Sequence, residues 1–100
     1  MRDIAPSISV KDVVIAVSRE ADIPTEALLG RSKRSPLPRW RNLAFLLAHE
    51  LAHQPYTEIG RAMDRNHSTV HYGCKRTKRD METDYALRFT YDKLKSELNG

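Results

Sequence analysis

The spacing of apolar residues is the feature that most constrains the fold of this chain. Valines and leucines recur three and four positions apart, and no stretch alternates apolar and polar residues long enough to predict a strand. A period of this kind places apolar side chains on one face of a helix. The pattern therefore predicts an all-α protein, a compact bundle of about five to six helices.

Local start and stop signals divide this pattern into separate helices. Ser9 and Asp12 match the S/T-x-x-D/E capping box at the start of a valine-rich helix. Gly30 predicts the end of a short helical turn, and a basic loop, Arg31–Pro38, follows it. Pro55 ends a leucine-rich helix. The helices expected after the loop cover residues 39–52, 57–63, 67–81 and 84–98.

Length and composition exclude several classes of protein. The 100 residues suit one domain, 1–100, with an ordered core expected at about 8–98. Cys74 is the one cysteine, which excludes an intrachain disulfide and favours a cytoplasmic location. The longest apolar run, Leu43–Ala48, is too short to cross a membrane, and Met1–Asp3 does not begin a signal peptide. None of the four glycines belongs to a phosphate-binding loop of a P-loop ATPase or to a dinucleotide-binding loop, so we expect no bound nucleotide. We also expect no other cofactor and no metal.

The basic residues gather in two zones, although the net charge is only +4. Residues 27–49 contain five arginines and lysines and no acid, and residues 61–79 contain six basic residues and one acid. Basic runs are also found on solvated surfaces that bind nothing. Their concentration on one loop and one helix favours a surface that faces a polyanion.

The segment at residues 57–81 is typical of a helix-turn-helix. A short helix is followed by a polar connection of about three residues and by a helix that begins with small polar side chains. Such side chains donate and accept hydrogen bonds at base edges, and Lys75 and Arg76 further along can reach phosphates. The plainer interpretation is that Asn66 caps the helix and that Ser68 and Thr69 are ordinary first-turn residues.

A competing motif, H-E-x-x-H, occupies His49–His53. On a helix it would place two imidazoles on one face beside a carboxylate, as in a small zinc peptidase. His67 and His71 repeat the same spacing. Pro55 ends the helix at once, and the chain offers no strand to hold a substrate backbone. We therefore keep this enzyme as a distant alternative and expect no enzymatic activity.

Five motifs occur in an order and spacing that together are specific. They are I-S-V-K-D-V-V, L-L-G-R-S-K-R-S, R-N-L-A-F-L-L-A-H-E-L, T-E-I-G-R-A-M and R-N-H-S-T-V-H-Y-G-C-K-R. With them, the span Ile8–Leu98 resembles the C-terminal DNA-binding domain of the bacterial replication initiator DnaA. The resemblance implies a Trp-repressor-like fold with a helix-turn-helix that binds double-stranded DNA.

The resemblance also implies roles for individual residues of this chain. Lys33 or Arg34 matches the arginine that the family places in the minor groove. The residues that match the major-groove signature are Arg65, Asn66, His67, Ser68 and Thr69. The phosphate contacts expected from resemblance and charge together are Arg39, Arg41, Asn42, His49, Thr57, Lys75 and Arg76.

The chain departs from the family in three respects. Asn66 stands where the family has an aspartate, and an asparagine suits adenine whereas an aspartate suits cytosine, so we expect a changed base preference. The connection before this signature is about one residue shorter than usual, which should tilt the recognition helix slightly. The ATPase module of the family is absent from these residues, so its nucleotide-driven assembly is not implied for them.

The expected function is sequence-specific DNA binding, most simply as a transcription regulator at the nucleoid, for example an activator of phage-like or gene-transfer-agent genes. RNA polymerase or another transcription or replication protein would be a second partner. The alternative within DNA binding is recognition of replication-origin boxes. A third class is a protein-interaction module, in which Tyr85, Phe89 and Tyr91 of the last helix form an aromatic patch. The plainer interpretation places Tyr91 in the core.

Overall fold

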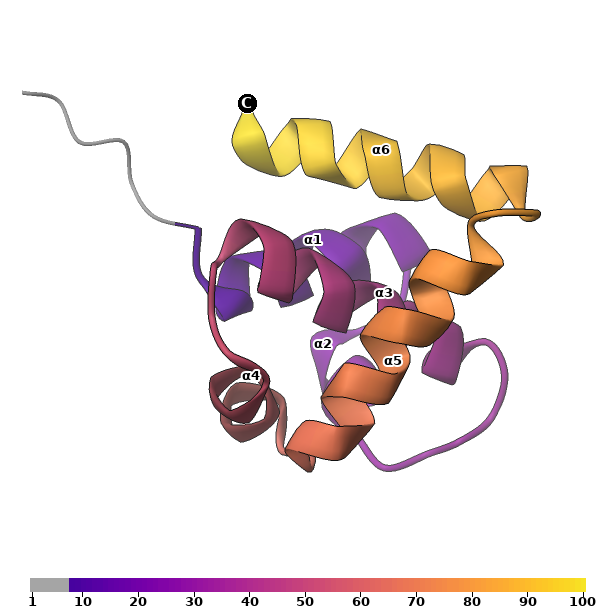
Figure 1. Ribbon diagram of the computed structural model, residues 1–100. Helices are drawn as coiled ribbons and strands as arrows, with labels where there is room; N and C mark the ends of the chain where they lie inside the picture. The colour runs from indigo at the N-terminus through magenta and orange to yellow at the C-terminus, as the bar shows by residue number, and fades with distance from the viewer. Residues whose placement is uncertain (1–7) are drawn as a thin grey trace, which may run out of the picture.

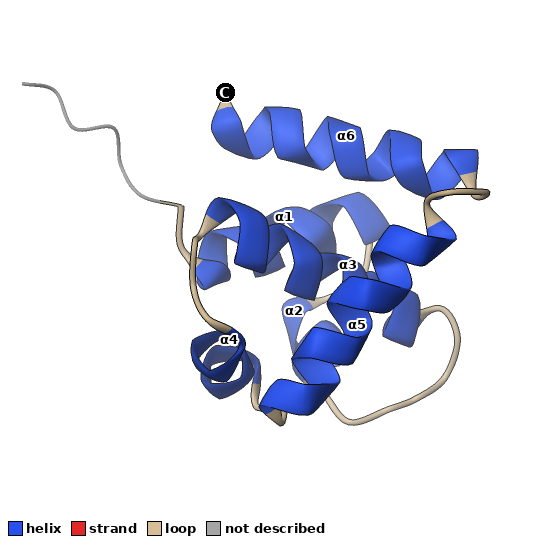
Figure 2. Cartoon of the chain, viewed as in Figure 1, coloured by secondary structure: helices blue, strands red, loops and turns tan. Residues whose placement is uncertain are grey.

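The computed structural model describes residues 8–100, which fold into helices joined by short loops (Figure 1). The predicted all-α architecture is confirmed, and no strand occurs within residues 8–100 (Figure 2). The helices are α1 (Val10–Ala21), α2 (Thr25–Leu29), α3 (Leu37–Leu51), α4 (Tyr56–Met63), α5 (His67–Asp80) and α6 (Tyr85–Asn99). The first seven residues of the expected domain, Met1–Asp3 included, lie outside the described residues.

The predicted capping box starts α1. Ser9 Oγ accepts a hydrogen bond from the backbone N–H of Asp12 at 3.0 Å, and the Asp12 carboxylate accepts one from the backbone N–H of Ser9 at 2.9 Å. These two hydrogen bonds hold the pKa of Asp12 below its ordinary value. Behind the cap, Val13 and Val17 are fully buried, so the predicted valine face packs into the core.

Helix α3 is the centre of the fold. Every residue from 43 to 48 is buried, whereas the sequence predicted a single leucine stripe. The reason is that α3 packs against all five of the other described helices. The helix begins at Leu37 rather than at Arg39, so the prediction that the basic loop reaches Pro38 is wrong. Pro38 fits the first helical turn because that turn suits its fixed φ angle and needs no N–H donor from it.

Helices α4 and α5 form the predicted helix-turn-helix. Asp64 ends α4 in the left-handed region, with φ 57°. The chain then folds back, and the backbone N–H of Arg65 donates to the carbonyl oxygen of Gly60 at 2.7 Å. A Cβ atom at position 60 would lie 2.3 Å from the carbonyl oxygen of Arg65. The turn is therefore so close to α4 that only glycine fits at that point.

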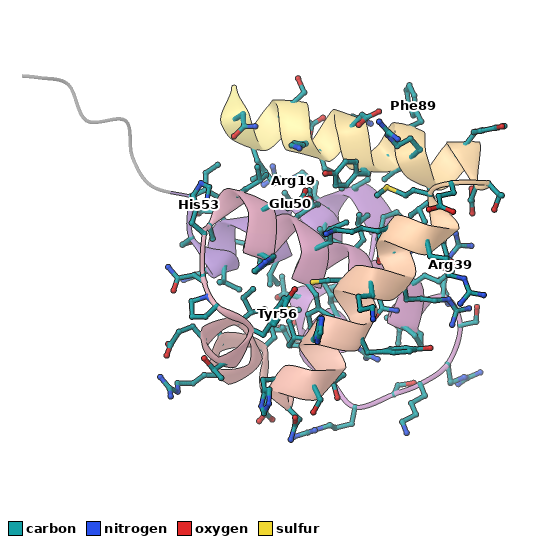
Figure 3. All side chains as sticks on the ribbon, in the orientation of Figure 1. Arg19, Arg39, Glu50, His53, Tyr56 and Phe89 are labelled. Carbon is teal, nitrogen blue, oxygen red and sulfur yellow. The ribbon has the colours of Figure 1, made fainter. Side chains whose placement is uncertain are left out.

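Helix α6 crosses α1 and α3 at the end of the molecule away from the start of α5 (Figure 1). Tyr91 and Leu94 are buried, as the plainer interpretation of the last helix predicted. Tyr85 and Phe89 are 80% and 70% exposed, and Phe89 points away from the bundle (Figure 3). None of the described helices combines the length and apolar character that a membrane span requires.

Candidate nucleic-acid interface

The first turn of α5 presents the predicted major-groove residues to solvent. Asn66, His67, Ser68 and Thr69 are all exposed. Oδ1 of Asn66 accepts hydrogen bonds from the backbone N–H of Ser68 at 2.8 Å and from its hydroxyl at 2.6 Å. The interpretation of Asn66 as a helix cap is therefore confirmed, and its amide nitrogen is the atom left for a base. A bidentate contact with adenine needs both atoms, so the changed base preference stays a prediction.

A cleft of about 440 Å³ lies between the recognition helix and the basic loop. Its walls include Lys33 from the loop, Asn42 from α3, and Thr69 and Tyr72 from α5. Lys33 and the adjacent Arg34 are exposed. The structure thus brings the predicted minor-groove residues beside the predicted major-groove turn. Their contacts with DNA stay predictions.

Arg41 and Arg65, two of the predicted DNA contacts, are held by the backbone of the protein itself. The acceptors are carbonyl oxygens of residues 27, 28 and 32 for Arg41, and of residues 29, 30, 63 and 64 for Arg65. Arg41 is only 6% exposed, although the sequence predicted a phosphate ligand there. Burial, and then the charge of Arg65, lower the pKa of Arg41 below its ordinary value, but a guanidinium remains cationic.

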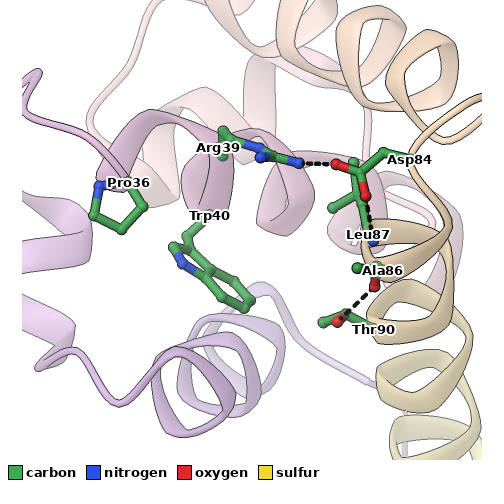
Figure 4. A pocket seen from close by; sticks show the side chains of 7 residues that line it. All are labelled: Pro36, Arg39, Trp40, Asp84, Ala86, Leu87 and Thr90. Carbon is green, nitrogen blue, oxygen red and sulfur yellow. Dashed lines mark hydrogen bonds and ion pairs between the residues drawn. The ribbon is translucent and has the colours of Figure 1, made fainter.

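Arg39 and Arg76 line a second cleft, and each is paired with a carboxylate. Arg39 Nη2 lies 2.5 Å from Asp84 Oδ2 (Figure 4), and Arg76 Nε lies 3.2 Å from Asp80 Oδ2. Exposed ion pairs of this kind contribute little stability, so a phosphate can replace the carboxylate. Lys75 lies on the same helix as Arg76 and is exposed. Arg39, Lys75 and Arg76 thus remain candidates for phosphate contacts at the rim of the surface.

Three aromatic rings from three helices stack on the other side of α5. The ring of Tyr56 lies between His49 and His71, with centroid distances of 4.4 Å and 4.7 Å and interplanar angles of 29° and 19°. Figure 3 shows Tyr56 between α4 and α5. Thr57 follows Tyr56 and is exposed. The predicted phosphate residues His49 and Thr57 therefore flank the recognition helix opposite the basic loop.

The H-E-x-x-H motif does not place two imidazoles on one helical face. Helix α3 ends at Leu51, and His53 lies beyond it in the left-handed region, with φ 55° (Figure 3). Glu50 accepts a hydrogen bond from the hydroxyl of Tyr91 and lies 3.8 Å from Lys95 Nζ. Across residues 8–100, no group of three or more His, Cys, Asp and Glu side chains is placed to hold a metal ion. The geometry that the zinc peptidase alternative requires is therefore not formed.

Sequence reasoning missed three residues of this surface: Tyr56, His71 and Tyr72. Tyr72 is 61% exposed, and its hydroxyl accepts a hydrogen bond from Arg76 at 3.2 Å. His71 and Tyr72 follow His67 and Ser68 by one helical turn. The spacing of His67 and His71 was noted only for the zinc alternative, and the same i, i+4 spacing from Ser68 would have found Tyr72. Tyr56 has no such signal, because its stacking partners lie on two other helices.

The fold and this surface define a DNA-binding domain of the helix-turn-helix class. The family model described as bacterial DnaA protein helix-turn-helix matches residues 10–77. The chain belongs to that family, as the five sequence motifs predicted.

Curated relatives of the chain are replication initiators. The Chromosomal replication initiator protein DnaA 2 of Chlamydia trachomatis is 32% identical over 87 residues, which cover 84% of this chain and 19% of that protein. Its namesake in Chlamydia muridarum is 31% identical over 81 residues, covering 81% of this chain and 18% of that protein. The Chromosomal replication initiator protein DnaA of Leptospira biflexa is 26% identical over 87 residues, covering 87% and 20%. The chain thus spans about a fifth of the length of these relatives.

Proposed function

We propose that residues 8–98 form a unit that binds duplex DNA sequence-specifically by reading two adjacent grooves. The observation that carries this proposal is the exposed polar turn at residues 66–69, whose last residue, Thr69, lines the same cleft as Lys33 of the basic loop. Small polar side chains at the start of a recognition helix match the donors and acceptors of the major groove. The surrounding cations match the phosphates.

In this proposal the start of α5 enters the major groove, and Lys33 and Arg34 reach the adjacent minor groove. Asn42, His49, Thr57 and Lys75 are exposed or half-buried around this surface and would approach the two backbones. Two grooves read by one chain give a site of about ten base pairs without two-fold symmetry. A helix-turn-helix dimer would instead need two related half-sites.

We propose transcription regulation as the biological role, with RNA polymerase as the second partner and the nucleoid as the place of action. The support is the exposed polar start of α5 beside the basic loop, because binding to a promoter requires no more than such a surface. The names of the relatives, chromosomal replication initiator proteins, favour a second candidate, the binding of origin boxes. Chromatin immunoprecipitation separates the two roles, because a regulator occupies promoters whereas an origin-box binder occupies the replication origin.

The test of DNA reading uses a binding selection from random duplexes, followed by two variants on the selected site. Lys75→Ala should weaken binding to all duplexes alike. It should also reduce the slope of log affinity against log salt concentration by about one, the value of one released counterion. Ser68→Ala should lower affinity for the selected site more than for random DNA, by about 1–3 kcal/mol of lost discrimination. A selection that returns no preferred sequence at moderate salt would overturn the proposal.

A further inference from the structure

The C-terminal end of α2 is capped by two arginines that come from different parts of the chain. Four consecutive carbonyl oxygens accept hydrogen bonds from them. Arg41 donates to those of residues 27 and 28, and Arg65 donates to those of residues 29 and 30. Arg41 Nη2 lies 3.0 Å from the oxygen of Ala27, and its Nε lies 2.6 Å from that of Leu28. The last four carbonyl groups of a helix lack partners within the helix, and the helix end carries negative charge. The backbone N–H of Gly30 also donates to the oxygen of Ala27, at 3.2 Å. The two guanidinium groups supply donors to all four carbonyl oxygens, and positive charge at the helix end.

Each of these arginines also holds one of the two segments that would read DNA. Arg41 donates to the carbonyl oxygen of Ser32, which lies in the basic loop next to Lys33. Arg65 immediately precedes the recognition helix and donates to the carbonyl oxygen of Met63 at 3.1 Å. The end of α2 is therefore a common anchor for the loop and for the helix-turn-helix.

The geometry requires arginine at both positions. A guanidinium presents five N–H groups in a rigid plane, and Arg41 uses its Nε and both Nη atoms on three different carbonyl groups. A lysine has one nitrogen at the end of a flexible stem and does not span the same acceptors. The two arginines carry like charges next to the same carbonyl groups, and burial followed by the charge of Arg65 lowers the pKa of Arg41. The repulsion between the two guanidinium groups is compensated only while the carbonyl oxygens at the end of α2 accept hydrogen bonds from both of them.

We propose that Arg41 and Arg65 are positioning residues, which fix the distance between the minor-groove loop and the major-groove helix, and are not ligands of DNA. This inference rests on the proposed function, because it assigns the spacing of the two groove contacts to one anchor. The inference predicts that a positive charge at these positions is not sufficient to keep the two groove contacts in place. The planar shape of the guanidinium is required as well.

The test compares Arg41→Lys and Arg65→Lys with the wild-type protein on the selected duplex. Both variants keep the charge, so the dependence of affinity on salt should not change. Affinity for the selected site should fall by about tenfold or more, the value of one well-placed base contact. Methylation protection of adenine N3 in the minor groove should be lost or displaced by a base pair, while protection of guanine N7 in the major groove remains. The control is Arg61→Lys on the exposed surface of α4, which should leave all of these values unchanged.

A phosphate ligand would behave differently. In that case each lysine variant would retain affinity within about threefold and keep the minor-groove protection, since lysine also binds phosphate. That result would overturn the inference and leave the proposed function intact. A wild-type protein without any sequence preference would overturn both.

A second test uses only the wild-type protein, so it remains available if the lysine variants do not fold. In ¹⁵N spectra, the Nε–H groups of Arg41 and Arg65 should exchange slowly with water in the free protein and keep their shifts when the duplex binds. Exposed Arg34 should show the opposite behaviour. Large shifts of Arg41 or Arg65 on binding, or scalar coupling of their nitrogens to ³¹P, would show that they are DNA ligands and would overturn the inference.

Discussion

The side chain of Asn66 is bonded to Ser68 in a way that gives one residue two tasks. Its Oδ1 accepts from both the backbone N–H and the hydroxyl of Ser68, at 2.8 Å and 2.6 Å. The oxygen caps α5, and the amide nitrogen on the same exposed side chain has two N–H groups that can donate to a base. The observed helix cap and the proposed base contact thus depend on a single planar group, so substitutions at Asn66 separate the two roles.

Replacement of Asn66 by aspartate should keep the cap and change the base preference. A carboxylate still accepts from the Ser68 backbone, but it cannot donate, so the preferred base should become one with an exposed amino donor, such as cytosine. Asn66→Ala should cost about 1 kcal/mol of stability through the lost cap and should relax specificity at the same base pair. A base-by-base scan of the selected site and urea denaturation measure the two effects. An aspartate variant with the wild-type preference would show that Asn66 contacts no base.

Gly60→Ala should destabilise the protein, although alanine is the better helix former. In an open helix the change would stabilise by about 1 kcal/mol. Here the added Cβ would lie 2.3 Å from the Arg65 carbonyl oxygen, a backbone atom, so we expect a net loss of about 1–3 kcal/mol and weaker DNA specificity. Chemical denaturation and DNA titration check both. The matched control is Ala62→Gly at an exposed position of α4, which should cost about 1 kcal/mol and leave specificity unchanged.

The ring of Tyr56 should stabilise the packing of α4 against α3 and α5, because it stacks on a histidine of each. Tyr56→Phe keeps both stacked pairs and should be nearly neutral, whereas Tyr56→Leu should lower the free energy of unfolding by about 1–2 kcal/mol. Thermal denaturation at neutral pH measures the difference. Tyr85→Leu is the control, because Tyr85 is 80% exposed and a change there should stay within about 0.5 kcal/mol. Equal effects at positions 56 and 85 would contradict a structural role for the stack.

Cys74 should react slowly with thiol reagents while the protein is folded. Burial raises the pKa of its thiol from 9.0 to about 11, so near pH 8 the folded protein holds about 100-fold less thiolate than an ordinary cysteine. The unfolded chain loses this proton first as the pH rises, so the thiol should also lower stability progressively between about pH 9 and pH 11. Labelling with a chromogenic disulfide, with and without denaturant, measures the first effect. Alkaline denaturation of the wild type and Cys74→Ala measures the second, and rapid labelling of the folded protein would contradict both.

Much of the fold was predictable because its signals are local. The serine and aspartate of the capping box and the valine and leucine periods all act within a few residues. Pro55, expected to end α3, instead lies at the N-cap of α4, four residues beyond Leu51. The start of α3 was placed two residues late, because Pro38 is compatible with a loop and with a first helical turn alike. The exposed residues at the start of α5 were also found, since a short polar connection before a helix marks a recognition segment.

The amino-acid sequence by itself determined the helices, the helix-turn-helix and the position of the basic loop, since each depends on residues that are neighbours along the chain. The tertiary structure decided the partners of Arg41 and Arg65, the stack around Tyr56 and the separation of His53 from His49. Every residue carries a carbonyl oxygen, so no sequence pattern tells which carbonyl groups an arginine will meet. Only the packing of α2 against the basic loop and the turn before α5 selects them, and in our proposal this packing sets the distance between the two DNA-reading segments.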